Sequence, residues 1–300
     1  MRASEPADPP RDATRTAPAM PDATREGGAT LPQTRLLAGF LLMMGAMVLL
    51  PVMDGFAKHL QTRYPVAQVV WARYVFHLAI MLPLVLARFG PRALWPERVG
   101  VQVFRGSLLL GATTLFFASI ARMPLADTLA LFFVSPLVVT VLATLVLGEP
   151  VGWRRAAAVA VGFAGVLVIL RPGTGVFEWT ALLAVGAGTV HGLYMLTTRK
   201  LAGSAPPLVT LAYTALVGAI VMSAVVGFVW LPPTPGDFGL MLLLGLLAAA
   251  GHFLIIKAFD HAPAAWLAPV GYSEIVMSTL VGYVAFGDFP DGWTWVGIAI

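Results

Sequence analysis

Two stretches of the chain decide its fold, PLADTLALFFVSPLVVTVLATLVLGE at residues 124–149 and PAAWLAPVGYSEIVMSTLVGYVAFGD at residues 263–288. They align without a gap at a constant offset of 139 residues, which places Pro124 on Pro263 and the closing Gly-Glu on Gly-Asp. Leucine-rich helices match by chance, but proline and glycine interrupt helices, so their recurrence in one register indicates a shared structure. The chain is therefore expected to contain an internal repeat.

Apolar segments around these stretches are long enough to cross a bilayer, which takes about 20 helical residues. Helices are expected at about 36–58, 66–87, 102–121, 124–147, 153–170, 178–198, 207–230, 238–259 and 263–286. A tenth helix begins at Trp293 and is too short to span by Ile300, because a helix rises only about 1.5 Å per residue. The expected fold is an all-α membrane protein of ten transmembrane helices, the tenth cut short at residue 300.

The composition agrees with a membrane protein and limits its chemistry. Of the 300 residues, 58% are hydrophobic and 11% are charged, which leaves too few polar side chains to cover a water-soluble globule. The absence of cysteine excludes disulfides, thiolate metal sites and cysteine nucleophiles. The net charge of +4 does not indicate nucleic-acid binding, because the basic residues lie in the N-terminal tail or beside apolar segments.

Three parts are expected along the chain. Residues 1–34 are rich in Ala, Pro, Thr, Asp and Arg and should form a disordered cytoplasmic tail, because they have little apolar surface to bury. Residues 35–173 should form a first repeat of helices one to five, and residues 174–300 a second repeat of helices six to ten. An odd number of helices per repeat makes the second enter the membrane from the opposite side, the inverted topology typical of alternating-access carriers.

The short loops orient this bundle, since lysine and arginine favour the cytoplasmic side. With the tail inside, seven basic residues lie in inner loops and four lie in outer loops. The inner ones are Arg88, Arg92, Arg98, Arg154, Arg155, Arg199 and Lys200, and the outer ones are Lys58, Arg63, Arg122 and Arg171. A multi-pass protein with a cytoplasmic N-terminus is therefore expected.

The residues also carry a family resemblance. The runs RMPLADTLALFFVSPLVVTVLATLVLGEPVGWRRAAAVAVGFAGVLVILRPG (122–173) and GYSEIVMSTLVGYVAFGDFPDGWTWVG (271–297) resemble the two EamA-type halves of the drug/metabolite transporter superfamily, and the resemblance covers essentially residues 36–300. It implies a bacterial inner-membrane transporter of ten helices in two inverted repeats, with amino acids, nucleotide-like compounds, vitamins or drugs as substrates. The stretches PVMDGFAKHL (51–60) and YPVAQVVWARY (64–74) are similar to the branch of riboflavin importers and S-adenosylmethionine uptake carriers.

Ionisable residues inside the predicted helices are candidate site residues, because a charge at bilayer depth needs a partner, a cavity or a function. Glu274 is the strongest candidate: it shares a helix face with Ser278, four residues on, and lies close to Tyr272. We predict that Glu274 binds substrate or couples a proton. The alternative is a structural glutamate that is neutralised by a buried hydrogen bond or paired with Arg73 or Lys257.

A second group of candidates lies on the second helix. Arg73 and His77 are four residues apart and therefore share a face, beside Trp71 and Tyr74, whose rings suit a planar ligand. Arg73 is always charged, so it is a candidate to hold an anionic group of the substrate or Glu274. The alternative is an ion pair with Asp54 that joins the first two helices.

The remaining candidates lie on helices one, six and eight. The repeat superimposes Asp54 on His191 if a slip of two residues is allowed, so both are predicted at the interface of the repeats. The alternative for Asp54 is a bond to Lys58, one turn away. Tyr194 shares a face with His191, and these two either line a pore or join helices. His252 is either a site residue or bonds a neighbouring backbone carbonyl.

Several other unusual residues are given structural roles. Arg105 and Asp127 lie close enough to predicted helix ends for a topological or capping role. Pro51, Pro136 and Pro269 fall inside apolar runs and should kink their helices, which exposes carbonyl groups where a cavity can use them.

These features favour a secondary active transporter that moves a small polar or amphipathic metabolite through a midplane cavity by alternating access. An integral membrane enzyme is the alternative from another class, but the sequence has no HExxH metal pair, no paired-aspartate motif and no GxS nucleophile with a plausible histidine partner. Neither a channel loop nor an ATP-binding loop is present. No metal or cofactor is expected. The expected partners are a small-molecule substrate, membrane lipid and either protons or a counter-substrate. Export of drugs or amino acids, a scaffold role and a homodimer stay open as alternatives.

Overall fold

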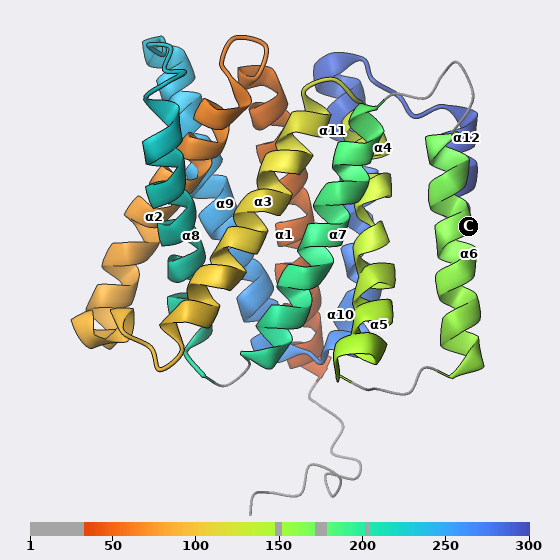
Figure 1. Cartoon of the computed structure of the whole chain (residues 1–300), viewed down its shortest axis with the longest axis horizontal. Helices are drawn as coiled ribbons and strands as arrows, with labels where there is room; N and C mark the ends of the chain where they lie inside the picture. The colour runs from red at the N-terminus through yellow and green to blue at the C-terminus, as the bar shows by residue number, and fades with distance from the viewer. Residues whose placement is uncertain (1–32, 148–151, 172–178, 202–203) are drawn as a thin grey trace, which may run out of the picture.

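The computed structural model describes residues 33–147, 152–171, 179–201 and 204–300 as a bundle of helices (Figure 1). The first half contains α1 (Gln33–Leu60), α2 (Val66–Phe89), the short 3-10 helix η1 (Pro91–Leu94), α3 (Val99–Ile120), α4 (Leu125–Phe132), α5 (Val134–Leu147) and α6 (Trp153–Leu170). The second contains α7 (Thr180–Lys200), α8 (Pro207–Val226), α9 (Pro235–His261), α10 (Ala264–Gly271), α11 (Ser273–Phe286) and α12 (Gly292–Ala299). Nearly all of the predicted tail lies outside the described residues.

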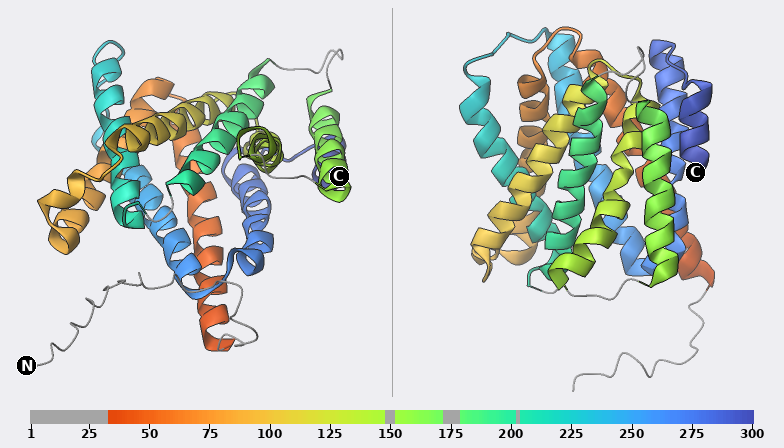
Figure 2. Two further views of the ribbon diagram at one scale, coloured as in Figure 1. Left: turned by 60° about the horizontal axis from the view of Figure 1, so that its bottom comes forward. Right: turned by 45° about the vertical axis from the view of Figure 1, so that its right-hand side comes forward.

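The described helices combine into ten segments. Seven spans are long and apolar enough to cross a membrane, one of them formed by α4 and α5 together, and most of α6 forms a shorter apolar helix. α10 and α11 continue one another as α4 and α5 do, and α12 packs beside α6 at the edge of the bundle (Figure 2). The predicted all-α membrane fold is confirmed.

The two halves cross the bundle in opposite directions. α1 begins at the bottom of Figure 1 and ends at the top, whereas α7 begins at the top and ends at the bottom. We name these the lower end, where α1 begins, and the upper end, where it ends. The loop after α1 is therefore at the upper end and the loop after α7 at the lower end, as an inverted repeat requires.

Each half breaks its fourth segment at an equivalent residue. α4 and α10 both have 8 residues, and α5 and α11 both have 14. The sequence offset of 139 residues maps the bounds of α4 onto those of α10 and the bounds of α5 onto those of α11. The breaks fall at Phe133 and Tyr272, which the same offset makes equivalent.

The expected proline kinks lie close to these breaks. Pro136 follows Phe133 by three residues and cannot donate a hydrogen bond to the carbonyl of Phe132, which favours a break at this point. Gly188 of α7 packs against that carbonyl, since an added Cβ would lie 2.4 Å from the Phe132 oxygen. Pro51, by contrast, lies inside the continuous helix α1.

Cross-half packing holds the bundle together. α1 packs against α9, α3 against α7, and α2 against α8. Gly218 of α8 lets α2 approach closely, because an added Cβ would lie 2.3 Å from the ring of Tyr74. Each central helix therefore has its main partner in the other half.

Candidate functional site

A cavity of about 220 Å³ lies between helices of both halves. Five of the predicted site residues line it, and each comes from a different helix: Asp54, Arg73, His191, His252 and Glu274. The rest of the lining is largely apolar and includes Phe116, Phe117 and Phe132, together with Met47, Leu50, Met53, Leu109, Ala112, Thr113, Leu129 and Ile255. Polar groups are few and face a mostly apolar wall, as in pockets for small molecules.

Arg73 is held by neutral neighbours. Its guanidinium donates a 2.7 Å hydrogen bond to Oγ1 of Thr113, and its Nε is buried without a partner. The guanidinium carbon lies 5.1 Å from the ring centroid of Tyr74 and 5.8 Å from that of Phe117. A hydroxyl and two ring faces stabilise a cation without neutralising it, so Arg73 keeps a positive charge available to the cavity.

The two carboxyl groups in the lining are not paired with this cation. Asp54 is buried and Glu274 is half-buried. Among the described residues, Arg73 forms no ion pair within 4.0 Å with the carboxylate of Asp54 or with that of Glu274. Lys58 binds Asp288 instead of Asp54, and Lys257 binds Asp260 instead of Glu274. The ion pairs considered as structural alternatives for Asp54 and Glu274 are therefore not formed among the described residues.

Two histidines complete the polar lining. Nδ1 of His191 lies 3.0 Å from Oγ of Ser135, and the ring of His191 lies 4.8 Å from that of Phe132. Nδ1 of His252 donates to the carbonyl of Ala248 at 2.9 Å, which matches the backbone bond considered for it. With Nδ1 as donor, a neutral His252 carries its acceptor at Nε2.

Six predicted residues lie outside the cavity lining: Trp71, Tyr74, His77, Tyr194, Tyr272 and Ser278. Three of them support residues that do line it. The Tyr74 hydroxyl lies 3.0 Å from Thr113 Oγ1, the His77 ring lies 6.0 Å from the His252 ring, and the Tyr194 ring lies 5.4 Å from the His191 ring.

The other three make contacts elsewhere. Trp71 donates its indole N–H to Oγ of Ser223 in α8, and Ser278 is buried in α11. Tyr272 stacks on Phe133, with the ring centroids 5.5 Å apart and the planes at 23°. The sequence placed these residues on site-bearing helices, but the structure turns them away from the lining.

Two polar residues near the site were not identified from the sequence. Thr113 lines the cavity and binds Arg73, but an isolated threonine in an apolar helix gives no signal. Arg105 was given a helix-end role and is instead buried among oxygens of the second half. It donates to Thr198 Oγ1 at 2.7 Å, Thr214 Oγ1 at 2.8 Å and the Tyr194 hydroxyl at 2.5 Å.

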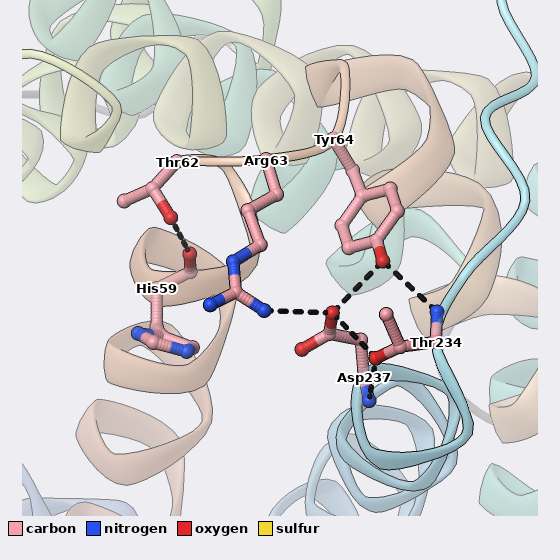
Figure 3. A network of polar contacts seen from close by, with 6 residues as sticks. All are labelled: His59, Thr62, Arg63, Tyr64, Thr234 and Asp237. Atoms are coloured by element: carbon pink, nitrogen blue, oxygen red, sulfur yellow. Dashed lines mark hydrogen bonds and ion pairs between the residues drawn. The ribbon is translucent and has the colours of Figure 1, made fainter.

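The upper end is closed by polar contacts between the two halves. Asp237, in the first turn of α9, accepts hydrogen bonds from the Tyr64 hydroxyl at 2.9 Å and from Thr234 Oγ1 at 2.8 Å, and it pairs with Arg63 at 3.2 Å (Figure 3). The side chain of Gln68 exchanges two hydrogen bonds with the backbone of Leu231. These contacts join the start of α2 to the linker before α9.

Two further ion pairs join the halves at this end. Lys58 binds Asp288 at 2.7 Å, and Arg171 binds Asp291 at 2.6 Å. Asp291 also caps α12 by accepting from the backbone N–H of Thr294. Burial raises the pKa of Asp291, but the hydrogen bonds from Thr294 and Arg171 outweigh this effect and leave the pKa below its usual value. Asp291 is therefore a carboxylate at neutral pH.

Comparison with known proteins agrees with this architecture. The EamA-like transporter family matches residues 37–171 and again residues 178–300. The S-adenosylmethionine uptake transporter of Rickettsia prowazekii is 30% identical over 88% of this chain and 90% of its own, and the riboflavin transporter of Rhizobium johnstonii is 31% identical over 89% of each chain. The pseudopaline exporter of Pseudomonas aeruginosa is 26% identical over 87% of this chain and 92% of its own.

A solved crystal structure shares the fold, with a TM-score of 0.62 at 20% identity over 89% of this chain and 93% of that one. These relatives are named as transporters, and the family model matches each half of this chain. The chain is a multi-pass membrane transporter, and it belongs to the EamA-like transporter family.

Proposed function

We propose that this protein is a secondary active carrier that moves a small metabolite with both an anionic and a cationic group across the bacterial inner membrane. The observation that carries the proposal is the cavity lining, in which Arg73, Asp54 and Glu274 are present without an ion pair between them. An ionisable group without a partner is costly at membrane depth. The substrate or a coupling proton would supply the missing partners.

Each part of the lining suits one part of such a substrate. Arg73 would bind the anionic group, because a guanidinium forms paired hydrogen bonds with a carboxylate. Asp54 and Glu274 would receive the cationic group, and Glu274 would release a proton when it does so. Phe116, Phe117 and Phe132 offer apolar surface to a planar part of the molecule.

Two candidate substrates come from the names of the relatives. S-adenosylmethionine has a carboxylate, an ammonium group, a sulfonium group and a planar base, whereas riboflavin is planar and uncharged. The charged lining therefore favours a substrate like S-adenosylmethionine. Riboflavin is the second candidate, supported by the aromatic side chains of the cavity.

Orientation and mechanism complete the proposal. The lower end would face the cytoplasm, because its loops carry more of the basic residues. Residues 35–173 and 174–300 would be the two repeats whose exchange of packing exposes the cavity to each side in turn. Uptake transporters and an exporter both occur among the relatives, so flux has to be measured in both directions.

The test is radiolabel flux in proteoliposomes, with and without a pH gradient, for S-adenosylmethionine, its decarboxylated form and riboflavin. Arg73→Gln should lower flux of S-adenosylmethionine about 10- to 100-fold, because a hydrogen bond to a charged group contributes about 1.5–3 kcal/mol. It should change flux of the decarboxylated form much less. Glu274→Gln should remove the response to the pH gradient.

Lys257→Gln is the matched control, because it also removes one positive charge from a helix but at an ion pair with Asp260 outside the cavity. It should leave flux unchanged. If no solute moves in either direction, the protein is not a carrier of these compounds. Recovery of a chemically altered solute would favour the membrane enzyme.

A further inference from the structure

The two ends of the bundle are packed differently. At the upper end α4 packs against α11, where a Cβ added at Gly282 would lie 3.9 Å from Cβ of Leu125. Because the repeat maps α4 onto α10 and α11 onto α5, the equivalent contact at the lower end would join α10 to α5. Among the described residues, α5 and α10 form no comparable contact. The upper end is closed in a way that the lower end is not.

Lys58 strengthens the upper contact. Its ammonium group donates to the carbonyl of Met123, just before α4, and to Asp288, just after α11, both at 2.7 Å. One side chain of α1 therefore joins the outer ends of both broken segments. The repeat provides no lysine for the same task at the lower end, since Lys58 corresponds to Met195 in the register that aligns Asp54 with His191.

The contact between Phe133 and Tyr272 lies where the two repeats meet. These residues form the breaks of their segments, are equivalent in the repeat, and stack on each other at 5.5 Å. A residue can touch its own repeat equivalent only near the pseudo-two-fold axis, because rotation about that axis exchanges the two. Contacts on the axis survive when the repeats exchange their packing, whereas contacts away from it are replaced by their equivalents.

We propose that the Phe133–Tyr272 stack is the fulcrum of the transport cycle, with α4 and α11 as the upper gate and α5 and α10 as the lower gate. The structure is then the conformation whose cavity faces the lower end. This inference rests on the carrier function proposed above. In the opposite conformation α5 packs against α10, which brings Ala143 beside Ala264, the repeat equivalents of Gly282 and Leu125.

Engineered disulfides test the two gates, since the chain has no cysteine of its own. The 3.9 Å separation at Leu125 and Gly282 falls within the Cβ distance of about 3.5–4.5 Å that a disulfide needs. In the variant Leu125→Cys/Gly282→Cys, the two cysteines should form a disulfide in the absence of substrate. This disulfide should stop flux, and its reduction should restore flux. Ala143→Cys/Ala264→Cys should cross-link as the carrier cycles and also stop flux. The single-cysteine variants are the controls.

A variant with all four cysteines decides whether the gates alternate. Mass spectrometry of the oxidised protein should find one disulfide or the other in each molecule and never both. Both disulfides in one molecule, or wild-type flux after complete cross-linking, would overturn the gate assignment and leave the carrier function intact. If the disulfides exclude each other and no solute moves in the wild type, the carrier proposal fails and the gates stand.

Substitution of the stacked pair tests the fulcrum. Tyr272→Ala should slow flux, and in the four-cysteine variant it should slow the exchange between the upper-gate and the lower-gate disulfide. The affinity for substrate of the protein cross-linked at Leu125→Cys/Gly282→Cys should stay the same. Tyr272→Phe keeps the ring and should restore interchange. Tyr283→Ala is the control, because Tyr283 is an exposed aromatic that pairs with Phe289 away from the break. Wild-type interchange in Tyr272→Ala would rule the fulcrum out.

Discussion

The hydroxyl of Tyr64 satisfies two groups at once, since it donates to Asp237 and accepts from the backbone N–H of Thr234. Tyr64→Phe should lower the free energy of unfolding by about 1–3 kcal/mol, because a buried carboxylate and a backbone donor each lose a partner. Arg63→Ala, which removes a side chain that is 60% exposed, should cost at most about 1 kcal/mol. Denaturant unfolding in detergent measures both.

A larger loss from Arg63→Ala than from Tyr64→Phe would show that charge, and not burial, stabilises this network.

At the scale of single residues, the sequence identified which residues are chemically unusual but not where their side chains point. Arg73 lines the cavity, whereas His77, one turn away, does not. Arg105 near a predicted helix end is buried among hydroxyl groups. These side-chain orientations depend on how neighbouring helices pack, and the periodicity of a single helix does not predict that packing.

At the scale of whole helices, close packing between two helices depends on individual glycines. Gly218→Ala should destabilise the packing of α8 on α2 by about 1–3 kcal/mol, because the new methyl group would overlap the ring of Tyr74. Gly239→Ala is the matched control, since an added Cβ in this part of α9 meets nothing within 4 Å. Thermal unfolding in the same detergent should show a lower midpoint only for Gly218→Ala.

Equal unfolding midpoints for both variants would mean that α2 can move away from α8 without a loss of stability.

Helix bounds were predictable where proline or charge ends an apolar run, and the predicted helix 153–170 matches α6. The breaks at Phe133 and Tyr272 were only approximated by Pro136 and Pro269. A proline frees a carbonyl, but the place where the chain bends also depends on a partner such as Gly188 in another helix.

Topology belongs to the scale of the whole molecule. Thr62 lies in the exposed loop at the upper end, and Trp95 is 79% exposed in the loop after η1 at the lower end (Figure 1). Thr62→Cys should react with a membrane-impermeant thiol reagent in intact cells, and Trp95→Cys only in inverted vesicles. The reverse pattern would place the lower end outside and contradict the proposed orientation. The recurring proline and glycine positions predicted the repeat, and the odd number of helices in each repeat predicted the inverted arrangement.

The surroundings of Arg105 have a consequence for biogenesis. Its partners Tyr194, Thr198, Thr210 and Thr214 all belong to helices that the ribosome delivers after α3. A nascent chain that has inserted only its first five segments therefore contains the Arg105 guanidinium before any of these hydrogen-bond acceptors has been synthesised. Maturation of the first half has to wait for translation of α7 and α8, so the halves are expected to become stable together and not one after the other.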